Sequence, residues 1–287
     1  MINFHKFGFL DAKRLQRYTK GKNYWHCTYN PIWIFIWSDY YKPEIAFDND
    51  FCYIRFLMPD IGMCYYPPLG DGDLVKGMNT IKSDCKEAGF DLNIAPIDEE
   101  LVIRLTKLNY KLKQNDVMIN YIYSNEALAF QRGFKARRSL ARVFEREHIN
   151  AFYKEIKKED FPLILEFIEA WHRENEDIKD SNYFSKLNAI KQMMDHLYEF
   201  DMHGIMLMDE ERVYGVAIGS TQDNVTFLHL NLALEGVTGS FEELLICFAK
   251  NALLRTRYLN ISDELGNIFK LSVKPVKKEG FYATFRL

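Results

Sequence analysis

The sequence predicts an α+β protein built from two tandem domains, each with a mixed, mostly antiparallel sheet flanked by helices. The 287 residues, 48% of them hydrophobic and 15% aromatic, provide enough apolar surface for two separate cores. The order of predicted elements also repeats: three strands, a helix and a closing strand occur in each half. We find no identity at a fixed period, so the repeat is one of element order. We expect one boundary, with domains at residues 1–130 and 131–287.

Hydrophobic spacing and turn residues define the elements of the first half. They predict a helix over 11–20, strands over 32–37, 51–57 and 61–66, helices over about 73–88 and 98–109, and a strand over 117–123. The apolar run Ile32–Trp37 is interpreted as a strand because it follows the turn at Asn30 and Pro31.

The second half is predicted in the same way. Helices begin near 160 and 181, strands cover 204–208, 213–219 and 225–232, a helix follows residue 240, and strands cover 258–261 and 281–287. This order echoes that of the first half.

Between the halves, Ser124 is positioned to cap a short helix that ends at Gly133, and a basic helix begins near Lys135. Four cations three or four residues apart share one face of it. That face could hold the phosphates of a polyanion. The alternative is a solvated surface, because nearby glutamates dilute the charge. The four cations are Lys135, Arg138, Arg142 and Arg146.

Composition excludes several classes of protein. A net charge of -3 argues against a protein that coats nucleic acid, so any such contact must be a local patch. Five cysteines without a CxxC pair fit a reducing compartment rather than a disulfide scaffold or a zinc site. There is no secretory leader pattern, and the longest apolar run is far shorter than a membrane span. We expect a soluble, cytoplasmic protein with no transmembrane segment.

A glycine-containing turn, Gly236–Ser240, stands between a predicted strand and a predicted helix. Backbone N–H groups at a helix start can bind an anion, and the helix dipole adds to the attraction. The alternative is an ordinary turn, since two glycines at a helix start are common. The corresponding turn in the first half carries Asp71 and Asp73, which would repel a phosphate, so it is interpreted as structural.

Near the C-terminus, Asp263 and Glu264 precede Lys270. A carboxylate there could take a proton from an attacking amine, and the lysine could stabilise developing oxyanion charge. The alternative is a helix cap followed by surface lysines. His229, beside Asn231, is interpreted as a core histidine rather than a metal ligand. We find no Ser-His-Asp arrangement, phosphate-binding Walker loop or zinc pattern.

Several stretches together make the chain resemble the C-terminal catalytic domain family of bacterial phosphatidylglycerol lysyltransferases, over nearly its whole length. The resemblance implies two tandem GNAT-type acyltransferase folds and transfer of an aminoacyl group from tRNA to a lipid. The stretches are Trp37–Tyr41, Tyr66–Gly70, Tyr121–Ala129 with Gly133, Arg137–Phe144, Asn260–Gly266 and Lys270–Pro275.

The chain departs from the family pattern at several positions. Where the family has Asn-Arg-Glu-x-Asp-x-Gly, Asn260–Gly266 lacks the arginine and the first glutamate and has Glu264 in place of the aspartate. The Glu-Lys pair after the strand histidine is replaced by Asn231 and Leu232. The Lys-Arg-Asn of the basic helix is replaced by residues 137–139, Arg-Arg-Ser. These changes leave both activity and a lipid acceptor open.

The resemblance and the residues together predict an acyltransferase-like protein that transfers an aminoacyl group from aminoacyl-tRNA to a lipid or to a small amine or hydroxyl acceptor, without cofactor or metal. One alternative is an N-acetyltransferase that binds acetyl-CoA at the same turn. Another is a non-catalytic binding module. The oligomeric state is open. The expected catalytic residues are Lys270, Glu264, Asp263 and Asn231, and the expected substrate-binding residues are Arg137, Arg138, Arg142, Gly236, Gly239, Ser240 and Ser272.

Overall fold

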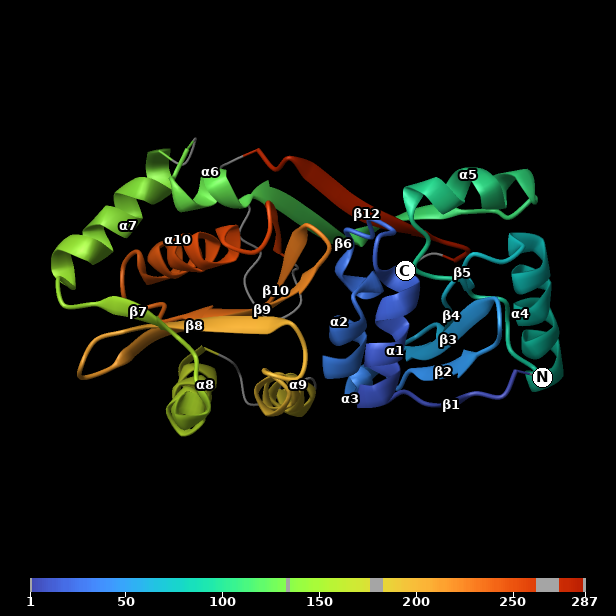
Figure 1. Ribbon diagram of the computed structural model, residues 1–287, viewed down its shortest axis with the longest axis horizontal. Coiled ribbons are helices and arrows are strands. Elements are labelled where there is room, and N and C mark those ends of the chain that lie inside the picture. The colour runs from blue at the N-terminus through green and yellow to red at the C-terminus, as the bar shows by residue number, and fades with distance from the viewer. Residues whose placement is uncertain (1, 133–134, 176–182, 262–273, 286–287) are drawn as a thin grey trace. The chain divides into compact units, whose positions relative to one another are not determined.

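The computed structural model describes residues 2–132, 135–175, 183–261 and 274–285 (Figure 1). The chain forms two compact units. The first unit is Met1–Ile119 with Glu279–Leu287, and the second is Asn120–Lys278. The expected boundary at 130/131 therefore differs from the observed division, because the C-terminal segment belongs to the first unit and the division falls inside a strand.

The first unit contains a small sheet in the order β1-β2-β3-β4, with β5 paired to β3. The strands of this sheet pair antiparallel. Its elements are β1 (His5–Lys6), α1 (Phe9–Thr19), η1 (Cys27–Tyr29), α2 (Pro31–Ile36), α3 (Ser38–Tyr41), β2 (Glu44–Phe47), β3 (Phe51–Met58), β4 (Gly62–Tyr65), β5 (Leu69–Gly70), α4 (Leu74–Ala88) and α5 (Glu99–Lys107).

The apolar run after Asn30 is helix α2, so the strand expected over 32–37 is wrong. The Asn30 carboxamide oxygen accepts from the backbone N–H groups of Ile32 and Trp33 at 2.9 and 3.1 Å. Pro31 occupies the first helical position, where its missing N–H costs nothing. Every residue of the helix is buried, so its sequence shows no amphipathic period and periodicity alone could not separate helix from strand.

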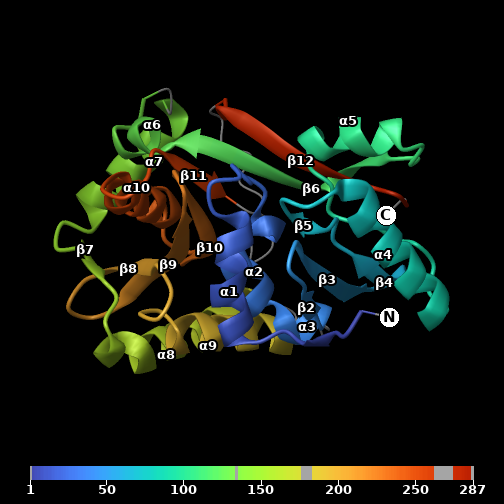
Figure 2. The same cartoon turned by 45° about the vertical axis from the view of Figure 1, so that its right-hand side comes forward.

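The second unit contains most of the seven-stranded sheet β12-β6-β11-β10-β9-β8-β7, of which β6 and β12 also run into the first unit. Helix α10 covers one face of its strands, and α8 and α9 lie on the other face (Figures 1 and 2). The elements are β6 (Lys113–Ser124), α6 (Asn125–Ala129), α7 (Lys135–Glu147), β7 (Phe152–Glu155), η2 (Lys158–Asp160), α8 (Phe161–Asn175), α9 (Tyr183–Asp195), β8 (Met202–Met208), β9 (Val213–Gln222), β10 (Val225–Ala233), α10 (Ser240–Leu253), β11 (Tyr258–Ile261) and β12 (Lys277–Ala283).

The same order of elements recurs in both units, which confirms the prediction of two tandem GNAT-like domains. In the second unit β8, β9 and β10 form an antiparallel meander, α10 follows, and β11 returns parallel to β10. In the first unit β2, β3 and β4 form the meander, α4 follows, and Ile94 returns beside Tyr65 in a parallel bridge. An antiparallel strand precedes each meander, β1 in the first unit and β7 in the second.

The strand after the parallel return explains why the first unit is not continuous in sequence. In the second unit β11 pairs antiparallel with the end of β6, from Tyr258 opposite Ser124 to Ile261 opposite Tyr121. In the first unit Ile97 pairs antiparallel with Tyr282, which comes from β12. The last strand of the chain thus completes the first unit.

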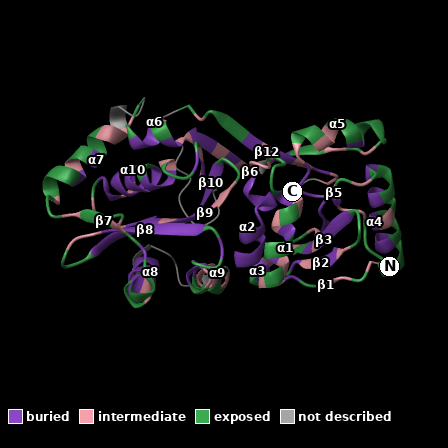
Figure 3. Ribbon diagram, viewed as in Figure 1, coloured by how far each residue is buried: buried purple, intermediate pink, exposed green. Residues whose placement is uncertain are grey.

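Each unit has its own hydrophobic core. In the first, buried residues of β3 pack against α4, including Phe51, Met78 and Ile81. In the second, α10 contributes more buried residues than any other element, with Leu244 and Phe248 fully enclosed. Figure 3 shows α10 almost entirely buried, whereas the outer face of α7 is exposed.

Candidate functional site

The start of α10 is shaped by a close backbone contact. Its N-cap residue, Gly239, has φ +81°, a left-handed conformation that glycine adopts without strain. A Cβ atom at this position would lie 2.0 Å from the backbone carbonyl oxygen of Leu140 on α7. Only glycine therefore fits here, and α7 lies directly against this side of the turn.

The remaining positions of the turn differ in how accessible they are. The Ser240 hydroxyl donates to the Leu234 carbonyl at 2.8 Å, and Ser240 is buried. Gly236 is exposed, and a Cβ atom there would meet nothing within 4 Å. The end of the turn is therefore occupied by the protein's own groups, whereas its beginning is open.

Two glutamates occupy the first turn of α10. Glu242 is buried, and its Oε1 lies 2.6 Å from an Arg137 guanidinium nitrogen on α7. Burial raises the pKa of Glu243, which accepts a hydrogen bond from the Cys247 thiol at 3.2 Å. Carboxylates near a helix N-terminus interact favourably with its dipole and oppose a second anion there.

The cations of α7 are not equivalent. Arg137 is not one of the four cations predicted to share one face of this helix. Its side chain lies against α10 and pairs with Glu242. Arg138 is half-buried, and both Arg142 and Arg146 are exposed. Arg146 lies 3.5 Å from Glu147, an exposed pair that contributes little to stability. The side chain of Lys135 lies outside the described residues.

Strand β10 leads into the turn and carries buried polar groups. The register between β9 and β10 shifts at His229, whose Nε2 lies 2.7 Å from the Ser220 hydroxyl. Burial lowers the pKa of His229 to about 3, so the ring is neutral near pH 7. Asn231 is half-buried, and its carboxamide oxygen has no hydrogen-bond partner among the described residues. It is a buried hydrogen-bond acceptor that no described group satisfies.

Four predicted site residues, Asp263, Glu264, Lys270 and Ser272, lie outside the described residues. The structure therefore brings Arg137 and Arg138 together with Glu242 in the first turn of α10, and it sets Gly239 against Leu140 on the same helix α7. It places Asn231 on the strand that enters the turn.

The corresponding helix start in the first unit is closed by its own side chains. Asp73 caps α4, its Oδ1 accepting from the N–H groups of Val75 and Lys76 at 2.7 and 3.2 Å. A Cβ atom on Gly72 would lie 2.6 Å from the Phe51 ring, and one on Gly70 would lie 2.2 Å from the Asp50 carbonyl oxygen. This packing agrees with the prediction that the turn has a structural role and does not bind a phosphate.

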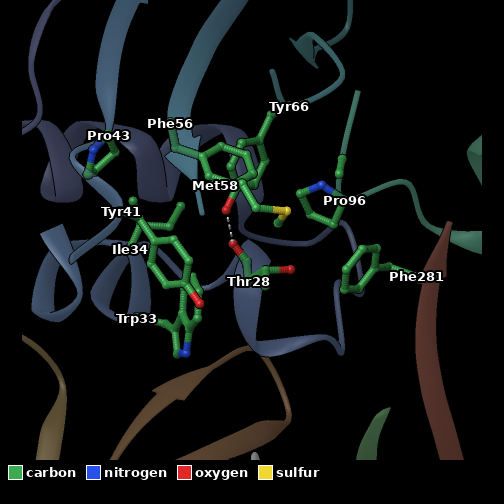
Figure 4. Close-up of a pocket in the computed structure, with 11 residues that line it drawn as sticks. Thr28, Trp33, Ile34, Tyr41, Pro43, Phe56, Met58, Tyr66, Pro96 and Phe281 are labelled. Carbon is green, nitrogen blue, oxygen red and sulfur yellow. Dashed lines mark hydrogen bonds between the residues drawn. The ribbon is translucent and has the colours of Figure 1, made fainter. Parts of the chain in front are cut away.

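The first unit also contains a small apolar cavity of ≈ 30 Å³ (Figure 4). The Tyr66 hydroxyl at its wall donates to the Thr28 carbonyl at 2.9 Å. An apolar cavity that binds benzene measures about 150 Å³, so this one has no room for a ring-sized ligand. Its lining residues are Thr28, Trp33, Ile34, Tyr41, Pro43, Phe56, Met58, Tyr66, Ala95, Pro96 and Phe281.

Sequence reasoning missed two features of the α10 site. Glu242 was not recognised as the partner of Arg137, although a glutamate in the first turn of a helix is a readable signal. The contact between Gly239 and the Leu140 carbonyl could not be predicted from the sequence, apart from the glycine itself. A contact with the backbone of a distant segment does not depend on which residues that segment contains.

These features define a tandem GNAT-like acyltransferase fold whose second unit carries the open helix-start turn. The family model for the C-terminal domain of phosphatidylglycerol lysyltransferase matches residues 23–267. The chain therefore belongs to this family, and it is an acyltransferase of the aminoacyltransferase-like type. No curated protein sequence matches the chain.

Solved structures show the same fold. A conserved protein of unknown function from Bacteroides thetaiotaomicron aligns over 99% of both chains with a TM-score of 0.91 and 18% identity. L-PGS from Bacillus licheniformis aligns over 94% of this chain and 90% of its own, with a TM-score of 0.64 and 12% identity. The C-terminal domain of a putative lysylphosphatidylglycerol synthetase from Agrobacterium fabrum aligns over 96% and 90%, with a TM-score of 0.62 and 10% identity.

Two further findings concern membrane-spanning helices and cysteines. Among the helices that the structure describes, none has the length and apolar character needed to cross a membrane. All five cysteines are free and buried.

Proposed function

We propose that the protein transfers an aminoacyl group from aminoacyl-tRNA to an amine or hydroxyl acceptor, a lipid headgroup or a small molecule, and that the second unit binds the donor. This proposal rests on the family to which the chain belongs and on the geometry of the turn at the start of α10. The turn is open at Gly236, while α7 covers its other side through the Leu140 carbonyl and the ion pair of Arg137 with Glu242.

The charges at this turn favour an aminoacyl ester over acetyl-CoA as the donor. The diphosphate of a coenzyme A thioester would need the N–H groups at the helix start, but Glu242 and Glu243 already oppose an anion there. The Leu140 carbonyl also covers Gly239. An aminoacyl ester has a neutral carbonyl and a cationic amino group, which this environment tolerates.

The phosphates of the tRNA would lie along the exposed side of α7. Arg138 and Arg142 are the candidates for this contact, because Arg137 is held by Glu242 and serves to fix α7 against α10. Arginine binds phosphate through paired N–H donors, and the attraction falls as salt rises.

The transfer itself is an acyl substitution. The acceptor nitrogen or oxygen bonds to the ester carbonyl carbon while a base takes its proton. The ester C–O bond then breaks, and that proton passes to the leaving 3′-terminal ribose oxygen. The unpartnered carboxamide oxygen of Asn231 could orient the acceptor N–H or O–H. For Lys270 we propose stabilisation of the oxyanion, for Asp263 or Glu264 the role of the base, and for Ser272 substrate binding, all from the sequence alone. The reaction needs aminoacyl-tRNA, so we place the protein in the cytoplasm of a bacterium.

Lys270→Met tests this function, because loss of a charge that stabilises a transition state costs about a hundredfold or more in rate. We expect transfer from radiolabelled aminoacyl-tRNA to be abolished while the melting temperature stays unchanged. Lys274→Met, an exposed lysine nearby, is the matched control and should keep full activity. Full activity in Lys270→Met would remove this residue from the mechanism. Wild-type protein that transfers acetyl groups from acetyl-CoA, or that transfers nothing, would contradict the proposed donor.

A further inference from the structure

Strand β7 ends the seven-stranded sheet, so in the described part of the chain one of its edges has no neighbouring strand. The Ile156 N–H donates to the Gly204 carbonyl on β8 at 2.9 Å. Successive residues of a strand alternate between its two edges. Lys154 therefore faces β8 with its N–H and C=O, and Tyr153 directs these groups to the free edge.

The side chains around this edge are apolar and exposed. Ile149 is 81% exposed, Phe152 46% and Tyr153 42%. An unpaired edge with apolar side chains is a template for pairing with another strand, and natural proteins usually protect such edges with charge.

The two charged residues of β7 do not protect it, because each is engaged inside its own unit. The Lys154 ammonium lies 2.6 Å from a carboxylate oxygen of Asp160. Glu155 accepts a hydrogen bond from the Asn251 carboxamide at 2.8 Å. The charge of Lys154 is therefore neutralised by its partner, and the Glu155 carboxylate is held toward α10.

Two other edge strands in the described residues, β1 and β12, are protected. β1 is two residues long, and both of them, His5 and Lys6, are polar and exposed. β12 begins with two exposed lysines, Lys277 and Lys278. Short strands and lysines are the usual defences against edge pairing. β7 differs from both.

We propose that β7 pairs antiparallel with β7 of a second copy of this chain, around a twofold axis at Tyr153. An antiparallel strand pair is self-complementary, so one edge supplies both donors and acceptors to its own copy. Centring on Tyr153 sets Lys154 opposite Phe152 of the second copy. Centring one residue later would set two Lys154 ammonium groups against each other, which is unfavourable.

Light scattering after size exclusion, over a range of concentrations, tests the pairing. We expect wild type to reach twice the chain mass as concentration rises, and Tyr153→Lys to stay at the single mass. Ile103→Lys, which puts the same charge on an exposed residue of α5, should behave as wild type. A wild type that is monomeric at every concentration, or a dimer that survives Tyr153→Lys, would overturn the proposal.

A crosslink tests the register without depending on a disruptive charge. All five native cysteines are buried, so Tyr153→Cys introduces a single exposed thiol. A directly opposed hydrogen-bonded pair has its Cα atoms about 5.5 Å apart, within the range of about 4.4–6.8 Å that a disulfide spans. We expect mild oxidation to link Tyr153→Cys into a dimer much faster than Leu254→Cys, a control residue that is 85% exposed. Equal rates for the two variants would contradict the twofold axis at Tyr153.

Discussion

The two units place a helix start at the same point of the same topology, yet they treat it differently. In the first unit Asp73 caps α4. Gly70 is packed against Asp50, and Gly72 is packed against Phe51 at the start of β3. In the second unit the N-cap of α10 is Gly239, and Glu242 is paired with Arg137 from a neighbouring helix. A shared fold thus does not imply a shared site, because a few side chains decide whether the backbone donors of a helix start are available.

The largest effect should come from Gly239→Ala. The added Cβ would lie 2.0 Å from the Leu140 carbonyl in a conformation that alanine adopts only with strain, so α7 must move. We expect a loss of about 3 kcal/mol in the free energy of unfolding, measured by urea denaturation. Gly236→Ala meets no atom within 4 Å and should stay within about 0.5 kcal/mol of wild type. Equal stability of both variants would show that α7 does not pack on this turn as described.

A smaller effect is expected on the stability of the fold at acidic pH. Burial, with a contribution from Arg255, lowers the pKa of His203 on β8 to about 4. The unfolded chain takes up this proton near pH 6.5 and the folded chain does not, so stability falls as pH drops below about 6.5. At pH 5 the loss is about 2 kcal/mol for this residue.

His203→Phe should remove much of that loss, because the ring stacks on Phe248 at 5.4 Å and an apolar ring can keep the contact. The measurement is urea unfolding of wild type and variant at pH 7 and pH 5. If both lose the same stability between these pH values, His203 does not remain neutral in the folded protein.

The smallest effect should come from the closed helix start. Asp73→Ala removes the cap of α4, which typically costs about 1 kcal/mol. Aminoacyl transfer should not change, because this turn belongs to the unit without the proposed donor site. Loss of transfer with unchanged stability would break the functional distinction between the two helix starts.

The sequence predicted long elements well and short ones poorly. The helices α4, α7 and α10 carry clear apolar stripes or caps and were found. The edge strands β1 and β7 were missed because they are only two and four residues long and mostly exposed, so they show no hydrophobic alternation. The α2 run was assigned to the wrong class because it is apolar on all sides.

For the site, the sequence indicated the Gly236–Ser240 turn and the basic helix. It could not separate the role of Arg137 from that of its neighbours. Helical spacing places Arg138 and Arg142 on one face of α7. The pairing of Arg137 with Glu242 depends instead on how α7 packs on α10. Such packing between distant segments is set by tertiary structure, which local spacing does not encode.

The central claim, that the second unit binds aminoacyl-tRNA along α7, is tested most directly by filter retention of labelled aminoacyl-tRNA at several salt concentrations. We expect wild type to bind with an affinity that falls as salt rises, and excess acetyl-CoA not to compete. The Arg138→Ala, Arg142→Ala double variant should bind more weakly with a shallower salt slope, and the Lys86→Ala, Lys107→Ala control, two exposed lysines of the first unit, should bind as wild type. Unchanged affinity and slope in the arginine variant, or displacement by acetyl-CoA, would contradict the claim.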